Sequence, residues 1–293
     1  MRTFLLSMLA AAAASAQQDF SRVEIKPAKV AGNVWFLKGS GGNIAATVGD
    51  DGVAIVDDQF APLSAKIHAA LAQLSPKPVK FVLNTHWHFD HTGGNVAFAD
   101  TATIFAHENV RKRMQKGDTI LGLLVEPAAP AALPVVTFER GLSLWWNGEE
   151  IRAIHPAPGH TDGDAVIWFT KSNVVHLGDD FVTYGFPFVD LKSGGSVTGL
   201  IQALDSILGQ IPKDAKIIPG HGEVSTVDDV RKFRSALEEM VGAVKKGLKA
   251  GKSVAQLQKD HVLAAWEAGW GKGKFVSADD FTAVIAEDLS KKK

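Results

Sequence analysis

Cysteine is absent from this chain of 293 residues. Disulfide bonds are therefore excluded, and a metal site would have to use histidine, aspartate or glutamate because no thiolate is available. An excess of charge of one sign is also missing, since 31 lysines and arginines against 32 aspartates and glutamates leave a formal net charge of -1. This balance gives no electrostatic reason to expect binding to nucleic acid or to an anionic membrane surface.

An apolar run long enough to span a bilayer is missing as well, because the N-terminal run over residues 4–14 is too short. It follows Arg2 and ends at Ala14-Ser15-Ala16, a small-residue pattern typical of signal-peptide cleavage. We expect residues 1–16 to be a signal peptide and the protein to be periplasmic or secreted, without stable membrane insertion after cleavage. An uncleaved anchor is the alternative, and the lack of a stop-transfer pattern disfavours it.

Residues 17–293 show neither an internal repeat nor a linker, so we expect a single domain that ends in helices. Apolar runs predict strands at 34–37, 44–48, 53–56, 80–83, 103–106, 135–138, 142–146, 151–154, 165–169 and 174–177. Apolar spacing of three and four predicts helices at 63–74, 107–115, 197–209, 227–248, 254–263 and 278–289. The order indicates an α/β fold of two mixed sheets faced by helices. For the apolar, weakly periodic segment 117–134, a helix packed on the body is favoured over a lid.

The most informative stretch is Thr-His-Trp-His-Phe-Asp-His at residues 85–91, which follows a predicted strand. A strand that ends in such a turn directs several side chains to one place. Neutral imidazole and carboxylate groups suit zinc. A polar turn with chance histidines is the alternative, and three histidines within six residues, in a chain with ten, disfavour it.

Three more strand-end signals lie downstream, each with a histidine or aspartate beside glycine after an apolar run. One such histidine alone is more often part of a capped turn than a ligand. Together the four signals supply enough ligands for two zinc ions. The candidate ligands are His86, His88, Asp90, His91, His160, Asp179 and His221, and the histidines not expected to bind metal are His68, His107, His155, His176 and His261.

In order and spacing, Asp57, the run at 86–91, His160, Asp179 and His221 resemble the pattern of the metallo-β-lactamase superfamily, over about residues 34–221. The resemblance implies an αββα sandwich of two mixed β-sheets flanked by helices, with the metals at one edge. It also implies these roles: His86, His88 and His160 hold one zinc, Asp90, His91 and His221 hold a second, Asp179 bridges them, and Asp57 supports the metal-binding loop.

The activity that this resemblance implies is that of an exported dizinc metallo-hydrolase acting on a small-molecule substrate. A metal-bound hydroxide would attack an ester, lactone, thioester or amide-type bond, and Asp90 would orient the nucleophile or pass a proton to the leaving group. Two Zn²⁺ ions are expected, and other divalent metals also fit the ligand set. A true β-lactamase and a non-hydrolytic metal-binding or redox accessory protein of the same fold are the alternatives. The sequence leaves the oligomeric state open.

The substrate pocket is less well specified than the ligand set. Asp179 stands where one group of β-lactamases has a cysteine ligand, and Val182 stands where those enzymes carry a substrate-binding lysine. The ligand set instead resembles that of glyoxalase II-like hydrolases. The best candidate for an apolar pocket wall is the aromatic run of Tyr184, Phe186 and Phe188, which favours a substrate with an apolar acyl portion; ordinary core packing is the alternative. The loop at 39–43 and the segment 121–134 are further candidates.

Overall fold

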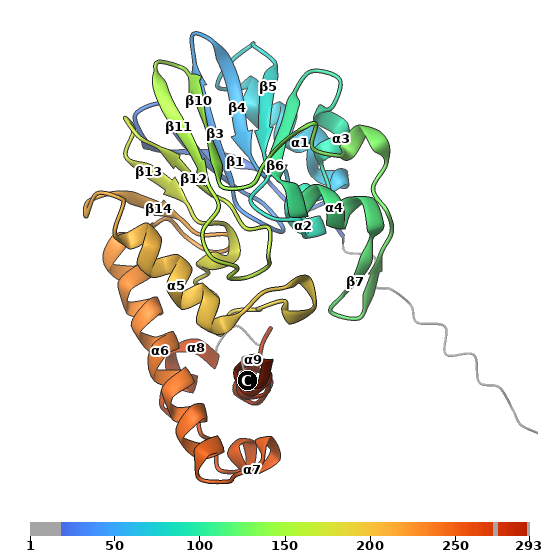
Figure 1. The fold of residues 1–293 in the computed structure, drawn as a ribbon. Coiled ribbons are helices and arrows are strands. Elements are labelled where there is room, and N and C mark those ends of the chain that lie inside the picture. Colours follow the sequence, from blue (N-terminus) through green and yellow to red (C-terminus); the bar gives the residue numbers. More distant parts are fainter. Residues whose placement is uncertain (1–18, 272–274, 292–293) are drawn as a thin grey trace, which may run out of the picture.

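The computed structural model describes residues 19–271 and 275–291 of the chain (Figure 1). The predicted signal peptide at residues 1–16 lies outside these described residues. No helix in the described part of the chain has both the length and the apolar character needed to cross a membrane.

The first half of the chain builds a seven-stranded mixed sheet in the order β1-β2-β3-β4-β5-β6-β9. The pairs β1–β2, β2–β3 and β3–β4 are antiparallel, whereas the pairs β4–β5, β5–β6 and β6–β9 are parallel. The bounds are β1 Lys26–Ala31, β2 Val34–Lys38, β3 Ile44–Gly49, β4 Gly52–Val56, β5 Val79–Leu83, β6 Thr103–His107 and β9 Val136–Phe138. The predicted strands of this half are confirmed, and β1 was not predicted.

A second mixed sheet of six strands follows, in the order β10-β11-β12-β13-β14-β15. Only β13 and β14 pair in parallel. The bounds are β10 Gly141–Trp146, β11 Glu149–Ile154, β12 Val166–Phe169, β13 Val174–His176, β14 Lys216–Ile218 and β15 Ser225–Thr226. The sequence predicted β10 to β13 and missed the two short strands β14 and β15.

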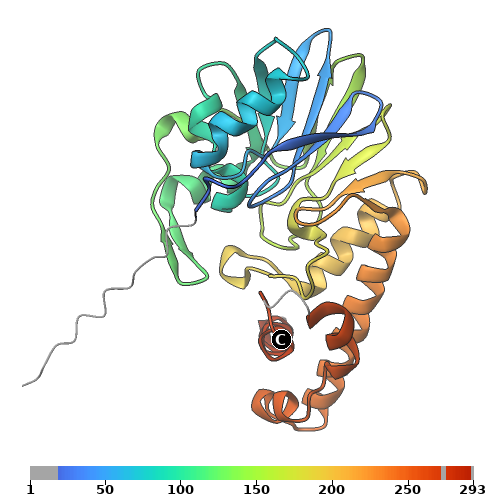
Figure 2. The ribbon, with the colours of Figure 1, turned by 180° about the vertical axis from the view of Figure 1, so that it is seen from behind.

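The two sheets face each other across a buried layer in which Phe36 and Leu83 of the first sheet meet Ile151 and Ile167 of the second. Helix α1 (Ser64–Ala72) packs its buried face, including Ile67, on the first sheet. Helices α5 (Val197–Leu208) and α6 (Val227–Lys249) cover the second sheet, and Figure 2 shows α1 and α6 from behind. This arrangement confirms the predicted αββα sandwich.

The C-terminal helices α7 (Val254–Lys259), α8 (Ala264–Trp270) and α9 (Ala278–Lys291) join the core of α5 and α6. The predicted helical tail is therefore confirmed. Figure 1 shows α7 at the lower end of α6, and α8 and α9 beside α6 below α5.

The segment 117–134 is not the apolar helix that the sequence favoured. It forms a hairpin of β7 (Asp118–Ile120) and β8 (Leu123–Val125), followed by the 3-10 turn η2 (Pro130–Ala132). Gly117 and Gly122 have φ of 67° and 80°, values that favour glycine and interrupt a helix. Leu121 shares the left-handed turn, with φ of 51°. These two glycines are the sequence signal that was missed.

Candidate metal centre

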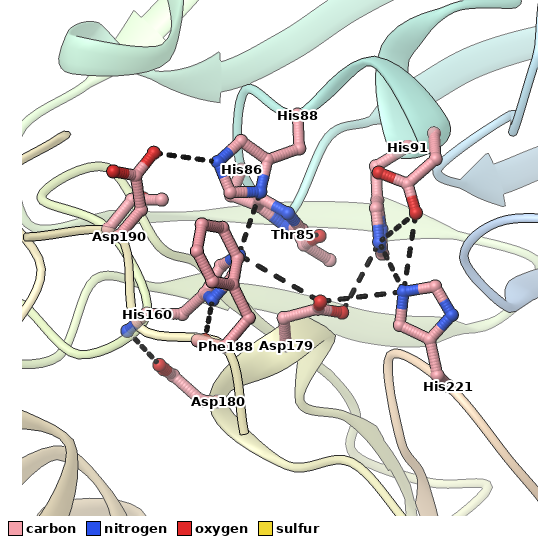
Figure 3. Close-up of polar contacts among 12 residues, drawn as sticks. Thr85, His86, His88, His91, His160, Asp179, Asp180, Phe188, Asp190 and His221 are labelled. Atoms are coloured by element: carbon pink, nitrogen blue, oxygen red, sulfur yellow. Dashed lines mark hydrogen bonds and ion pairs between the residues drawn. The ribbon is translucent and has the colours of Figure 1, made fainter. Parts of the chain in front are cut away.

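The candidate ligands come together at one edge of the sandwich, from segments far apart in the sequence (Figure 3). The end of β5 leads into the turn that carries His86 and His88 and into the short helix α2 (Phe89–Thr92), which carries Asp90 and His91. The other three candidates come from the second sheet. His160 lies in the loop between β11 and β12, Asp179 in the 3-10 turn η3 (Gly178–Asp180) after β13, and His221 in the loop after β14.

The seven side chains fall into two groups that share Asp179. In the first group, ligand atoms of His86, His88 and His160 lie within 4.8 Å of one another, and in the second, those of Asp90, His91 and His221 do. Asp179 reaches both groups. Its Oδ1 lies 3.2 Å from His91 Nε2, and its Oδ2 lies 3.4 Å from His221 Nε2 and 3.8 Å from His160 Nε2.

Hydrogen bonds on the outer side of the first group fix which ring nitrogens carry protons. His160 Nδ1 donates to the carbonyl oxygen of Phe188 at 2.7 Å, and His88 Nε2 donates to Asp190 Oδ2 at 3.1 Å. The inner nitrogens, His88 Nδ1 and His160 Nε2, face each other at 2.9 Å. In neutral rings that donate through their outer nitrogens, each inner nitrogen carries a lone pair and no hydrogen. Two such nitrogens cannot hydrogen-bond to each other. A cation between them satisfies both.

His86 is held in the same way. The Thr85 hydroxyl donates to Asp57 Oδ2 at 2.7 Å and accepts from His86 Nδ1 at 3.0 Å. The other ring nitrogen, Nε2, is buried and has no hydrogen-bond partner. A buried polar atom without a partner costs about 1–3 kcal/mol, so it needs an explanation. Coordination of a metal ion, together with His88 and His160, provides one.

Asp57 links the two groups from behind the ligands. Besides Thr85, its Oδ2 accepts from His91 Nδ1 at 2.7 Å, which leaves His91 Nε2 directed at Asp179 and His221. Its Oδ1 accepts from the Thr85 backbone N–H at 2.7 Å. Asp57 is fully buried and has a left-handed φ of 60°. One carboxylate thus positions two imidazoles.

The charge states of the two groups differ. Burial and the neighbouring rings of His91, His160 and His88 hold the pKa of His86 well below its usual value. Burial and His88 likewise lower the pKa of His160 to about 4. Both rings are therefore neutral at pH 7, the form that binds metal.

In the second group, burial opposes protonation of the histidines, but the effect of the neighbouring carboxylates is larger. Burial lowers the pKa of His221, yet Asp179 and Asp90 raise it to about 9. Asp90, Asp179 and Asp57 likewise hold the pKa of His91 well above its usual value, against the effect of burial. Burial raises the pKa of Asp179, but His221 and His91 lower it well below the ordinary range. A divalent cation can replace the protons that balance these carboxylates.

Asp190 is a functional candidate that the sequence did not reveal. Besides the His88 ring, it accepts the Ser193 hydroxyl at 2.6 Å, and Ser193 accepts from Trp87 Nε1 at 3.1 Å. Burial opposes ionisation, but the hydrogen bonds from His88 and Ser193 hold the pKa of Asp190 below its usual range. Asp190 lies 102 residues from His88, so no local spacing could identify the pair.

A cavity of about 390 Å³ opens onto both groups, and His88, Asp90, Asp179 and His221 lie at its floor. Tyr184 and Phe188 form one wall. The β7–β8 hairpin contributes Ile120, Leu121 and Leu123 to the lining, which is completed by Phe60, Phe89 and Phe275.

Phe186, the third aromatic residue of the predicted wall, does not reach this cavity. It is buried against Trp270 and Phe281, with ring centroids 5.9 and 5.6 Å away. Gly185, with φ of 140°, sets the backbone between Tyr184 and Phe186. For Phe186 the structure therefore shows the core packing that was the alternative to a pocket role.

The loop at 39–43 packs behind the ligands instead of lining the cavity. A Cβ on Gly42 would lie 2.2 Å from His91 Cε1, so only glycine fits beside that ring. Asn43 Nδ2 donates to the carbonyl oxygens of Pro219 and Gly222 at 2.8 and 2.9 Å, which fixes the loop of His221.

Among the described residues, the five other histidines belong to none of the ligand groups.

Comparison with known proteins agrees with this geometry. The family model described as the metallo-beta-lactamase superfamily matches residues 30–221. Over 159 residues, 53% of this chain, the sequence is 29% identical to 2,4-dinitroanisole O-demethylase subunit alpha from Nocardioides sp. (strain JS1661), and the match covers 45% of that subunit. Over 158 residues, 50% of this chain, it is 30% identical to a probable metallo-hydrolase of Methanocaldococcus jannaschii, with 72% of that protein covered.

Among solved structures, the crystal structure of the DIM-1 metallo-beta-lactamase superimposes with a TM-score of 0.61. The superposition covers 74% of this chain and 99% of that enzyme, at 19% sequence identity. At this identity the likeness establishes the fold alone.

Proposed function

Because the chain belongs to the metallo-beta-lactamase superfamily, we propose that it is a dizinc hydrolase that cleaves an ester, lactone, thioester or amide-type bond in a small molecule. In this proposal, one zinc ion would be held by His86, His88 and His160, the other would be held by Asp90, His91 and His221, and Asp179 would serve both.

The observation that carries this proposal is the set of inward-facing lone pairs. His88 Nδ1 and His160 Nε2 face each other at 2.9 Å while their outer nitrogens donate elsewhere, and His86 Nε2 is buried without a partner. Imidazole and carboxylate groups without thiolate suit zinc, and the arrangement leaves space for a water molecule at the cavity floor. When bound, zinc ions supply Lewis acidity that polarises a carbonyl group and lowers the pKa of water.

The chain's own residues then position the reactants. Asp90 Oδ2 faces His221 Nε2 at 3.3 Å and His91 Nε2 at 3.7 Å. Its Oδ1 is left to accept a proton from the attacking water and to donate it to the leaving group. The apolar walls exclude bulk water from the reacting bond, which strengthens the electrostatic interactions at the floor. No side chain needs to form a covalent intermediate.

Zinc analysis and hydrolysis assays on the same preparations test the proposal. Purified protein dialysed against zinc should bind two equivalents and hydrolyse p-nitrophenyl butyrate or a simple lactone, and a chelator should abolish turnover until zinc is returned. His160→Ala should lose zinc and activity. His68→Ala, a histidine outside the ligand groups, is the matched control and should keep both.

Two results would contradict the proposal. Zinc content that stays at or below one equivalent would rule out a dinuclear site. Full turnover in the chelated protein removes the metal-dependent mechanism. Hydrolysis of nitrocefin alone, with esters and lactones untouched, would instead identify a β-lactamase.

A further inference from the structure

Resting on the hydrolase proposed above, we infer that the cavity selects substrates whose acyl portion is apolar and uncharged, and that it discriminates against acyl portions that end in a carboxylate. This specificity comes from the wall of the cavity and not from the metal ligands.

Apart from the Tyr184 hydroxyl, the polar groups of the cavity belong to the candidate ligands at its floor. In the described part of the chain, every polar lining residue except Tyr184 is one of the candidate ligands, and neither lysine nor arginine lines the cavity. Tyr184 provides a phenol that can hydrogen-bond to a neutral oxygen but offers no positive charge. Val182, which occupies the position of the substrate-binding lysine in related β-lactamases, is buried and pairs with His221 through a β-bridge.

The wall, in contrast, is apolar and partly exposed to solvent. The side chains of Leu121, Leu123 and Phe275 are 54%, 56% and 53% exposed, and all three line the cavity. Exposed apolar side chains gathered around one opening mark a surface that an apolar ligand covers. A carboxylate placed against this wall would lose its hydration without gaining a cationic partner, which is unfavourable. The positive charge of bound metals acts on the reacting group at the floor, whereas the far end of the acyl chain lies along the wall.

Two distant segments build this part of the cavity. The hairpin carries Leu121 and Leu123, and Phe275 comes from the C-terminal region, beyond the segment 30–221 that the family model matches. The Phe275 ring lies 5.6 Å from that of Tyr184 and 6.2 Å from that of Phe188. The C-terminal region therefore completes a substrate wall that the segment 30–221 alone does not supply.

A pair of hydroxamates that differ only in the end of their chain tests the inference without requiring turnover. Both hexanohydroxamic acid and the monohydroxamate of adipic acid can bind zinc through the hydroxamate, but the second ends in a carboxylate. Calorimetric titration of the zinc-loaded protein should give a dissociation constant at least about tenfold lower for hexanohydroxamic acid. Equal affinities, tighter binding of the anionic compound, or no binding of either to the zinc-loaded protein would overturn the inference.

The hairpin offers a matched pair of variants. Leu123→Arg introduces a cation into the wall and should remove or reverse the preference. Leu124→Arg places the same charge on the adjacent residue, which is 72% exposed and does not line the cavity, and should preserve it. Phe275→Arg repeats the test at the other segment, should Leu123→Arg not fold. A preference that persists in both wall variants, or that disappears in Leu124→Arg, would overturn the role assigned to the wall.

Failure of the proposed hydrolase gives a different result. Zinc-loaded protein that hydrolyses neither p-nitrophenyl valerate nor p-nitrophenyl hemiglutarate, yet prefers hexanohydroxamic acid, would refute the hydrolase and support the selectivity. Hydrolysis of both esters at similar kcat/KM would support the hydrolase and overturn the selectivity.

Discussion

The two ligand groups differ in how far the protein encloses them. His86, His88 and His160 are buried, and each outer ring nitrogen is held by a hydrogen bond from within the fold. In the second group only His91 is buried, whereas the Asp90 and His221 side chains remain 22% and 24% exposed at the cavity floor. The first group is thus largely part of the interior, and the second contributes more of its side chains to the cavity.

This difference assigns separate tasks to the two groups. Three imidazoles held from behind by hydrogen bonds form a rigid site that should keep its metal. The second group, with a carboxylate and an exposed imidazole, should exchange its metal more readily and place it beside the substrate. Asp179, which reaches both groups, is the residue whose loss should separate them.

The largest effect is expected from Asp179→Ala. The second group loses one of its two carboxylates, while three imidazoles still hold the first metal, so we expect one zinc retained and turnover lowered by about 10–1,000-fold. Zinc content and kcat measured on the same preparation check this. The melting temperature should stay close to that of the parent protein because Asp179 lies at a strand end. Two tightly bound zinc ions with parental rates would show that Asp179 does not bridge the groups.

A smaller effect, confined to the first group, is expected from Asp190→Asn. The amide keeps the shape of the side chain but weakens the hydrogen bond that orients His88, and such changes lower metal affinity by about 10–100-fold. Asp57→Asn is the comparison, because Asp57 supports both His91 and, through Thr85, His86. Competition with a chromophoric chelator should show one weakened site in Asp190→Asn and two in Asp57→Asn. Two weakened sites in Asp190→Asn, or only one and the same weakened site in both variants, would remove the distinction between the groups.

The sequence was sufficient to propose the candidate ligands, because most of them belong to local motifs at predicted strand ends, and the structure brings their side chains into two groups. One turn carries His86, His88, Asp90 and His91. The residue that accepts the hydrogen bond from His88 could not be predicted from that turn. Asp190 reaches that ring through the fold, from 102 residues away. Hydrogen bonds of this kind leave no spacing that a single sequence displays.

The cavity wall was predicted less well for two physical reasons. Gly117 and Gly122 turn an apolar segment into a hairpin, and apolar content alone favoured a helix. Phe275 joins the wall only because the C-terminal helices fold back onto the loop of Tyr184 and Phe188. Side-chain direction in an irregular segment depends on backbone angles, and these are not encoded in a pattern of aromatic residues.

The smallest effect is expected from two aromatic residues of the same segment. Phe188 lines the cavity, whereas Phe186 packs in the core. The Phe188 ring lies 5.8 Å from the rings of both His88 and His160, while its backbone carbonyl holds His160. Phe188→Ala keeps that carbonyl, so zinc content should stay normal while kcat/KM for apolar substrates falls by about tenfold, the loss of one apolar contact. Phe186→Ala opens a hole in the core and should lower the free energy of unfolding by about 3–5 kcal/mol, with kinetics of the folded fraction unchanged. Measurements of kcat/KM, zinc content and the free energy of unfolding of both variants test these two expectations. Loss of zinc in Phe188→Ala would show that the Phe188 ring supports the first group directly. A lower kcat/KM in Phe186→Ala without loss of stability would show that the cavity extends beyond the residues that line it in this structure.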